Sequence, residues 1–146
     1  METADRVRAN TQERINRRID REIEECVREY AQKSPEEIAL RIGELDREWD
    51  IERVLETNAS ALAFTGLVLG VTRNKRWLWL PSIVLPFLFQ HAVQGWCPPV
   101  PLLRRLGVRT RQEIDREKYA LKVLRGDFSQ PESLPRPEAA LQSVRA

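Results

Sequence analysis

The sequence predicts an all-α protein, with a two-helix transmembrane hairpin and amphipathic cytoplasmic helices on both sides of it. Two closely spaced apolar segments, Ala59 to Thr72 and Trp77 to Val93, interrupt a chain in which 32% of residues are charged. Apolar residues in the flanks recur at helical spacing, and capping signals mark helix starts. We therefore expect four regions: charged amphipathic helices (1–57), the apolar hairpin (58–97), basic amphipathic helices (98–126) and a disordered Pro-containing tail (127–146).

The charge is divided unevenly along the chain. Residues 1–57 hold 16 acidic and 11 basic residues, and the rest of the chain holds 6 and 13. The basic residues that flank the two apolar segments outnumber the three in the turn, so the positive-inside rule predicts that both termini are cytoplasmic. The N-terminus has no apolar run, so neither a signal peptide nor a lipidation box is expected.

The first flanking helix is predicted from Thr11 to Gln32. Ile15, Ile19 and Ile23 recur every four residues and charged side chains fill the other faces, as in an amphipathic helix. The apolar stripe is narrow, so a partner helix must cover it. Packing is favoured over a role at a lipid surface, because the polar face mixes acids and bases.

A second helix begins after Ser34, where Pro35 and Glu37 complete a capping-box pattern. Its apolar positions keep helical spacing as far as Thr57. Gly43 weakens this helix by about 1 kcal/mol relative to Ala without stopping it. Two antiparallel helices joined near residue 33 are therefore predicted.

The first apolar run, residues 58–72, is short for a membrane span. It would cover about 22 Å, against a hydrocarbon core of about 30 Å. Trp77 and Trp79 suit a membrane interface, and the basic side chains of the turn can reach toward headgroups. Gly66 and Gly70 have the small-xxx-small spacing of packed membrane helices. The alternative is the core helix of a soluble bundle.

The second apolar segment is expected to bend at Pro81 and Pro86 and to stop at Gly95. A short basic amphipathic turn that ends at Gly107 follows. The last helix begins with a capping box at Thr110 and runs to Arg125.

Part of the chain, about residues 53–110, resembles the YgaP-like inner-membrane domain family. The resemblance rests on three motifs, read in order: Asn74-Lys75-Arg76-Trp77-Leu78-Trp79-Leu80, Gly95-Trp96-Cys97-Pro98 and Leu102-Leu103-Arg104-Arg105-Leu106-Gly107-Val108. It implies a two-helix hairpin of unknown biochemical role in the bacterial inner membrane. Pro81, Pro86 and the second proline, Pro99, depart from the family pattern. The family also occurs behind rhodanese domains, but the charged helical front has no such fold, so sulfurtransferase activity is not expected.

Three residues are candidates for chemistry. Cys97 falls in the motif of the family, and Arg104 and Arg105 follow closely enough to favour a thiolate, although a packed apolar role is the preferred interpretation. His91 and Gln94 form a candidate intramembrane polar site, since ionisable groups are costly in lipid. His91 is expected to bond Gln94 or the backbone, and haem ligation by His91 from two subunits is a less favoured alternative. Cys26 and Cys97 are expected to stay unpaired.

No catalytic constellation, cofactor or metal is expected. The chain has one His and two Cys in separate regions, too few for a zinc site, and no Gly-rich phosphate loop. Arginines of the last helix alternate with acids, which argues against nucleic acid. The expected partners are the lipid bilayer, a second copy of the chain and a cytoplasmic protein bound through the N-terminal helices. The leading function is a non-enzymatic membrane anchor or association module, and the alternatives are a thiol-dependent sulfur or redox carrier and a soluble bundle.

Overall fold

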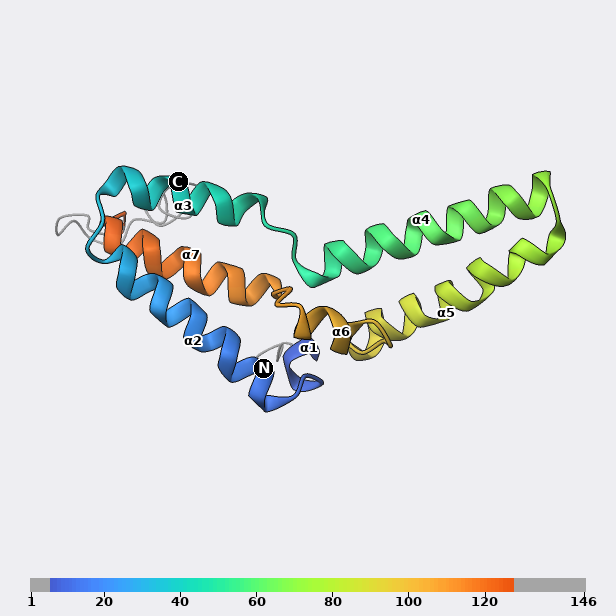
Figure 1. Ribbon diagram of the computed structural model, residues 1–146, viewed down its shortest axis with the longest axis horizontal. Coiled ribbons are helices and arrows are strands. Elements are labelled where there is room, and N and C mark those ends of the chain that lie inside the picture. The colour runs from blue at the N-terminus through green and yellow to red at the C-terminus, as the bar shows by residue number, and fades with distance from the viewer. Residues whose placement is uncertain (1–5, 128–146) are drawn as a thin grey trace, which may run out of the picture. The chain divides into compact units, whose positions relative to one another are not determined.

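The computed structural model describes residues 6–127, and these residues form helices without any strand (Figure 1). The predicted all-α class is therefore confirmed. The chain divides into two compact units, which we call the hairpin unit (Met1–Ile19 and Trp49–Gln112) and the three-helix unit (Asp20–Glu48 and Glu113–Ala146). Each unit joins segments distant in sequence, unlike the consecutive regions expected above. The predicted tail, apart from Asp127, lies outside the described residues.

The helices follow one another with short connections. They are α1 (Arg6–Ala9), α2 (Glu13–Tyr30), α3 (Pro35–Arg47), α4 (Ile51–Thr72), the 3-10 helix η1 (Lys75–Leu78), α5 (Trp79–Gln94), α6 (Val100–Arg105) and α7 (Arg111–Arg125). Helix α2 belongs to the hairpin unit through Ile19 and to the three-helix unit from Asp20. Helix α1 was not predicted, because four residues are too few to show a periodicity.

In the three-helix unit, α7 is the partner that the amphipathic helices need. Figure 1 shows it running beside α2 and α3. Ile114 and Leu121 of α7 are fully buried and share a core with the apolar stripe of α3, formed by Ile38, Ile42 and Leu45. Tyr30, at the end of α2, packs against the same core.

Helix α3 begins as predicted. The Ser34 hydroxyl accepts a hydrogen bond from the Glu37 N–H (3.3 Å), and the Ser34 N–H donates to the Glu37 carboxylate (3.0 Å). The two bonds satisfy backbone donors that the first turn of a helix leaves open. Gly43 lies inside α3 and does not interrupt it.

The predicted continuation of this helix to Thr57 is wrong. Helix α3 ends at Arg47, and α4 begins at Ile51 with Asp50 as its N-cap, whose carboxylate accepts from the Arg53 N–H at 2.8 Å. The Ile51 N–H also donates to the Arg109 carbonyl (3.0 Å), a long-range bond that anchors the start of α4. The apolar residues keep helical spacing across the break between α3 and α4, so the sequence pattern did not reveal this break. The first apolar run therefore lies in a 22-residue helix about 33 Å long.

Helices α4 and α5 form an antiparallel hairpin within one unit, joined by a tight turn (Figure 1). In the turn, the Asn74 side chain accepts from the Arg76 N–H (3.0 Å) and caps η1. Pro81, where a bend was expected, falls in the first turn of α5, where no helical N–H partner is lost. Pro86 lies inside α5, and the helix continues past it to Gln94.

Candidate functional site

Small residues bring the two helices of the hairpin into close contact. A Cβ atom added to Gly66 would lie 2.5 Å from Pro81 Cδ and 2.9 Å from Leu80 Cβ. At Gly70 an added Cβ would lie 2.5 Å from Leu78 Cδ2. Both glycines are buried, so the predicted small-xxx-small face packs against η1 and α5 of its own chain.

The hairpin also carries large apolar side chains that the described residues leave exposed. Phe64, Val71, Trp79 and Phe89 are each at least 68% exposed. Further exposed apolar residues are Leu62, Leu67, Val68, Trp77, Leu78, Ile83, Leu85, Phe87 and Val93. Exposure on this scale is rare in soluble monomers and marks an interaction surface.

One stretch of the described chain is long and apolar enough to cross a membrane, Pro35–Thr72, which includes α3 and α4. Its most apolar window has a mean hydropathy of 1.4 and is only 17% buried. Helix α5 has 16 residues, fewer than the roughly 20 that a straight span needs. Length and composition therefore identify one candidate span and not two.

Two hydroxyl groups of the hairpin, those of Thr72 and Ser82, bond backbone carbonyls of the preceding turn. Thr72 Oγ1 donates to the Val68 carbonyl (2.7 Å), and Ser82 Oγ donates to the Leu78 carbonyl (2.8 Å). Such bonds to the preceding turn remove the need for water as a partner.

The N-terminal helix caps the far end of α5. Arg6 Nη1 donates to the carbonyls of Ala92 and Val93, both at 3.0 Å, across 86 and 87 residues of sequence. A cation at this position satisfies open carbonyls and interacts favourably with the helix dipole. Gly95 follows with φ 71°, and an added Cβ would lie 2.4 Å from Arg6 Cβ. Helix α1 is therefore seated tightly on the base of the hairpin.

The Arg104 side chain is buried, so its charge is not exposed at the surface, and it does not favour a thiolate at Cys97. Its side chain is fully enclosed, with Nη2 donating to Asn16 Oδ1 (3.1 Å) and Nη1 donating to the Val108 carbonyl (3.1 Å). Asn16 in turn donates to the Arg8 carbonyl (3.0 Å). Arg104, expected to favour a thiolate at Cys97, instead ties α6 to the start of α2.

Cys97 is 3% exposed and lies in a core cluster with Val7, Ile51, Leu55 and Val100. Burial raises the pKa of its thiol, with a smaller opposing effect from the Val100 N–H, and no described arginine contributes. Nearby basic residues therefore do not lower this pKa, in contrast to the less favoured thiolate interpretation. The arrangement matches a packed thiol rather than a thiolate.

His91 is 8% exposed, and its Nδ1 atom has no hydrogen-bond partner among the described residues. The expected bond to Gln94 does not form, because the Gln94 side chain pairs with Gln90 (3.4 Å). His91 lines a pocket of about 820 Å³ at the base of the hairpin, between α1, α4 and α5 and the start of α7. Sequence analysis identified His91 but not the acidic and basic residues around it.

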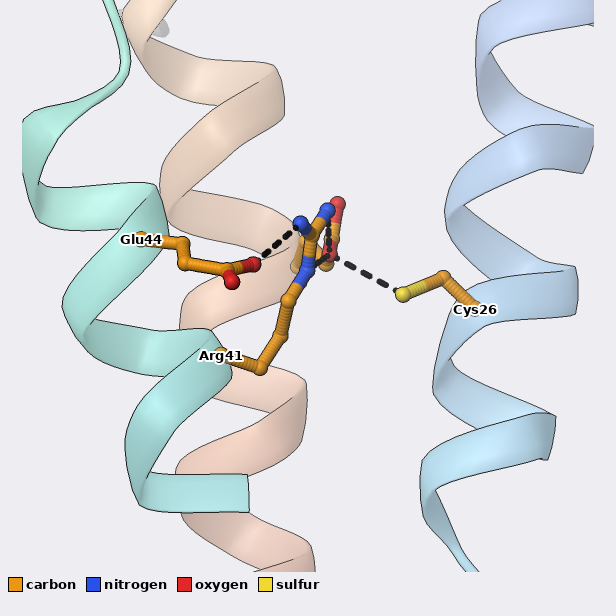
Figure 2. A network of polar contacts seen from close by, with 4 residues as sticks. Cys26, Arg41 and Glu44 are labelled. Carbon is orange, nitrogen blue, oxygen red and sulfur yellow. Dashed lines mark hydrogen bonds and ion pairs between the residues drawn. The ribbon is translucent and has the colours of Figure 1, made fainter. Parts of the chain in front are cut away.

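A separate polar network lies in the three-helix unit (Figure 2). The carboxylate of Glu117, whose side chain is 1% exposed, accepts from Arg41 Nε (3.0 Å), Arg41 Nη2 (2.9 Å) and Cys26 Sγ (3.2 Å). Arg41 also bonds Glu44 (3.0 Å). Burial, and then the bond to Glu117 and its charge, raises the pKa of Cys26 to about 11. This thiol therefore acts as a hydrogen-bond donor in an ion-pair network.

Among residues 6–127, no group of three His, Cys, Asp or Glu side chains has an arrangement that could hold a metal ion. Comparison of the chain with protein-family models, curated proteins and solved structures finds no match. The arrangement of the hairpin and its base is therefore the basis for the functional argument.

Proposed function

We propose that the chain is a small integral membrane protein in which the α4–α5 hairpin is an anchor and association module, and the three-helix unit offers a cytoplasmic surface to a protein partner. The observation that carries the proposal is the uncovered apolar surface of the hairpin. The core helix of a soluble bundle would be mostly enclosed, whereas the apolar window here is 17% buried. Lipid tails or a second hairpin are the partners that such a surface fits.

Two further features support insertion of the hairpin. The hydroxyls of Thr72 and Ser82 bond backbone carbonyls of the preceding turn, which suits a helix in lipid. Helix α5 is shorter than a full span, but η1 continues the apolar run by Trp77 and Leu78, and local thinning of the bilayer accommodates the difference. We retain the resemblance to the YgaP-like inner-membrane domain as part of this proposal.

The antiparallel hairpin sends both flanks to the same side of a bilayer, and the flanks carry more basic residues than the turn. We therefore propose a bacterial inner-membrane location with both termini in the cytoplasm. A reporter enzyme that is active only in the cytoplasm should be active when fused to the C-terminus and inactive when inserted at Lys75. The reverse result would overturn the orientation.

The alternative, a sulfur or redox carrier that uses Cys97, has less support, because the thiol is buried and its pKa is raised. Cys97→Ser discriminates between the two functions. An anchor should tolerate this change, whereas a carrier should lose its activity.

Carbonate extraction of bacterial membranes tests the proposal directly. The wild-type chain should stay in the membrane pellet. Phe64→Asp places a charge on the exposed apolar face of α4 and should release part of the protein, since Asp at the centre of a span costs about 3 kcal/mol.

The matched control is Leu40→Asp in the three-helix unit, where the replaced side chain is 72% exposed, close to the 68% of Phe64. This variant should remain in the pellet with the wild type. Release of the wild-type chain by carbonate would show that the hairpin is a soluble element and would overturn the proposal.

A further inference from the structure

The pocket at the base of the hairpin is lined by charged residues of both signs. Its volume, about 820 Å³, is within the range of small-molecule sites. Glu52, Glu56 and Ser60 follow one another at four-residue spacing and line the pocket from α4. Arg6 and His91 line it from α1 and α5. All of these residues belong to the hairpin unit.

Glu56 is an anionic group of the pocket that the described residues leave without a partner. It forms no hydrogen bond or ion pair with any described residue, and its side chain is exposed to the pocket region. Among the described residues, the guanidinium of Arg6 bonds the neutral carbonyls of Ala92 and Val93 and no carboxylate. Arg111 also lines the pocket, and its pair with Asp50 (2.7 Å) uses part of its five-donor fork.

His91 provides an independent indication of a ligand. The residue is more than nine-tenths buried, its Nδ1 atom lacks a partner within residues 6–127, and the charges that act on it are those of Arg6 and Glu56. Buried polar atoms are rarely left without a partner in proteins, and a group that enters the site is one way to supply it.

We infer that this pocket binds a zwitterion that carries a primary ammonium and a phosphate, the chemistry of a phosphoethanolamine lipid headgroup, with the ammonium at Glu56 and the phosphate at Arg6 and Arg111. The inference rests on the proposed membrane function. Glu56 precedes the apolar part of α4, which begins at Ala59, and His91 lies near the end of α5. The pocket is therefore at the level where lipid headgroups meet the hydrocarbon core.

The ammonium distinguishes this ligand from other phospholipids. A primary ammonium has three N–H donors for a carboxylate, whereas a quaternary choline headgroup has none. We expect the full chain in detergent micelles to bind phosphatidylethanolamine about ten-fold more tightly than phosphatidylcholine with the same acyl chains. Native mass spectrometry with each lipid in turn measures this ratio.

Glu56→Gln should reduce the ratio to about two-fold or less, because a neutral amide makes a weaker bond to the ammonium. Glu25→Gln is the matched control, since Glu25 is an exposed carboxylate on α2 in the three-helix unit. It should keep the wild-type ratio. Unchanged circular dichroism of both variants would confirm that the fold is intact. Equal binding of the two lipids by wild type, or a preference that survives Glu56→Gln, would overturn the inference.

A second arm identifies the source of the headgroup. Soluble phosphoethanolamine that displaces the lipid from wild type but does not bind Glu56→Gln would support the same chemistry in a free ligand. Selectivity for the lipid without such displacement would support the membrane lipid itself. The proposed function fails separately: release of the chain by carbonate would overturn membrane anchoring, and the soluble arm would still test the pocket.

Discussion

Within each of the two units of this protein, a different kind of contact holds the helices together. In the three-helix unit, charged side chains connect the helices around the core, through Arg41 and Glu117, Lys118 and Asp46, and Arg116 and Asp20. In the hairpin, the contact between α4 and α5 depends on glycines of α4 that leave space for the neighbouring helix. Ion pairs suit a surface in contact with water, whereas close backbone packing is the contact that remains strong in lipid. The difference matches the environments that we propose for the two units.

The largest expected effect is in the three-helix unit. Arg41→Met removes two hydrogen bonds from the buried Glu117 carboxylate and should lower the free energy of unfolding by about 3 kcal/mol. Hydrogen exchange at the amides of α7 should become faster accordingly. Arg28→Met is the control, because its pair with Glu24 is 3.6 Å long and both side chains are mostly exposed, so the loss should be below about 0.5 kcal/mol. Equal effects would contradict the role given to burial.

Two glycine substitutions should change stability in opposite directions. Gly66→Ala forces a methyl group against Pro81 and Leu80 and should destabilise the hairpin by about 2 kcal/mol. Gly43→Ala meets no atom within 4 Å inside α3 and should stabilise the protein by up to about 1 kcal/mol. Thermal unfolding of both variants in detergent provides the measurement. A neutral Gly66→Ala would show that the two helices of the hairpin are not in close contact.

A smaller effect is expected at the base of the hairpin. Gly95→Ala and Gly107→Ala both place a side chain at positive φ, which costs about 1 kcal/mol. Gly107 has open space around it, whereas at Gly95 the new methyl group also meets Arg6. Only Gly95→Ala should therefore release α1, seen as faster trypsin cleavage after Arg6 and Arg8. Equal cleavage of the two variants would argue against the seating of α1 on α5.

The smallest effect concerns the thiol of Cys26. With Cys97→Ser to leave one thiol, alkylation of Cys26 at pH 8 should be about ten-fold slower than that of a free thiol, because less thiolate is present. A raised pKa means that the neutral thiol persists to higher pH, so the rate should keep rising toward pH 11. A rate that levels off near pH 9 would show that Glu117 does not hold the proton on this thiol.

Local sequence signals predicted the start of α3, and the end of α7 at Arg125, because each depends on residues within about one helical turn. Gly126 has φ 88°, and the Asp127 N–H donates back to the Lys122 carbonyl (3.1 Å), as a glycine C-cap does. The Asp50 cap is also a local signal, but the helical spacing of Trp49, Val54 and Leu55 outweighed it. Helical periodicity shows which residues share a face and does not show whether the helix is continuous.

The amino-acid sequence by itself determined the helical class, the two apolar segments and the charged flanks, since these follow from composition and periodicity along the chain. Only the tertiary structure decided that α7 covers α3, that Arg104 turns inward to Asn16, and that Arg6 caps α5 from 86 residues away. It also brought Arg6, Glu56 and His91 to one pocket. These contacts join residues far apart in sequence, and their partners are selected by packing and by the need to satisfy buried polar groups, which no local pattern records.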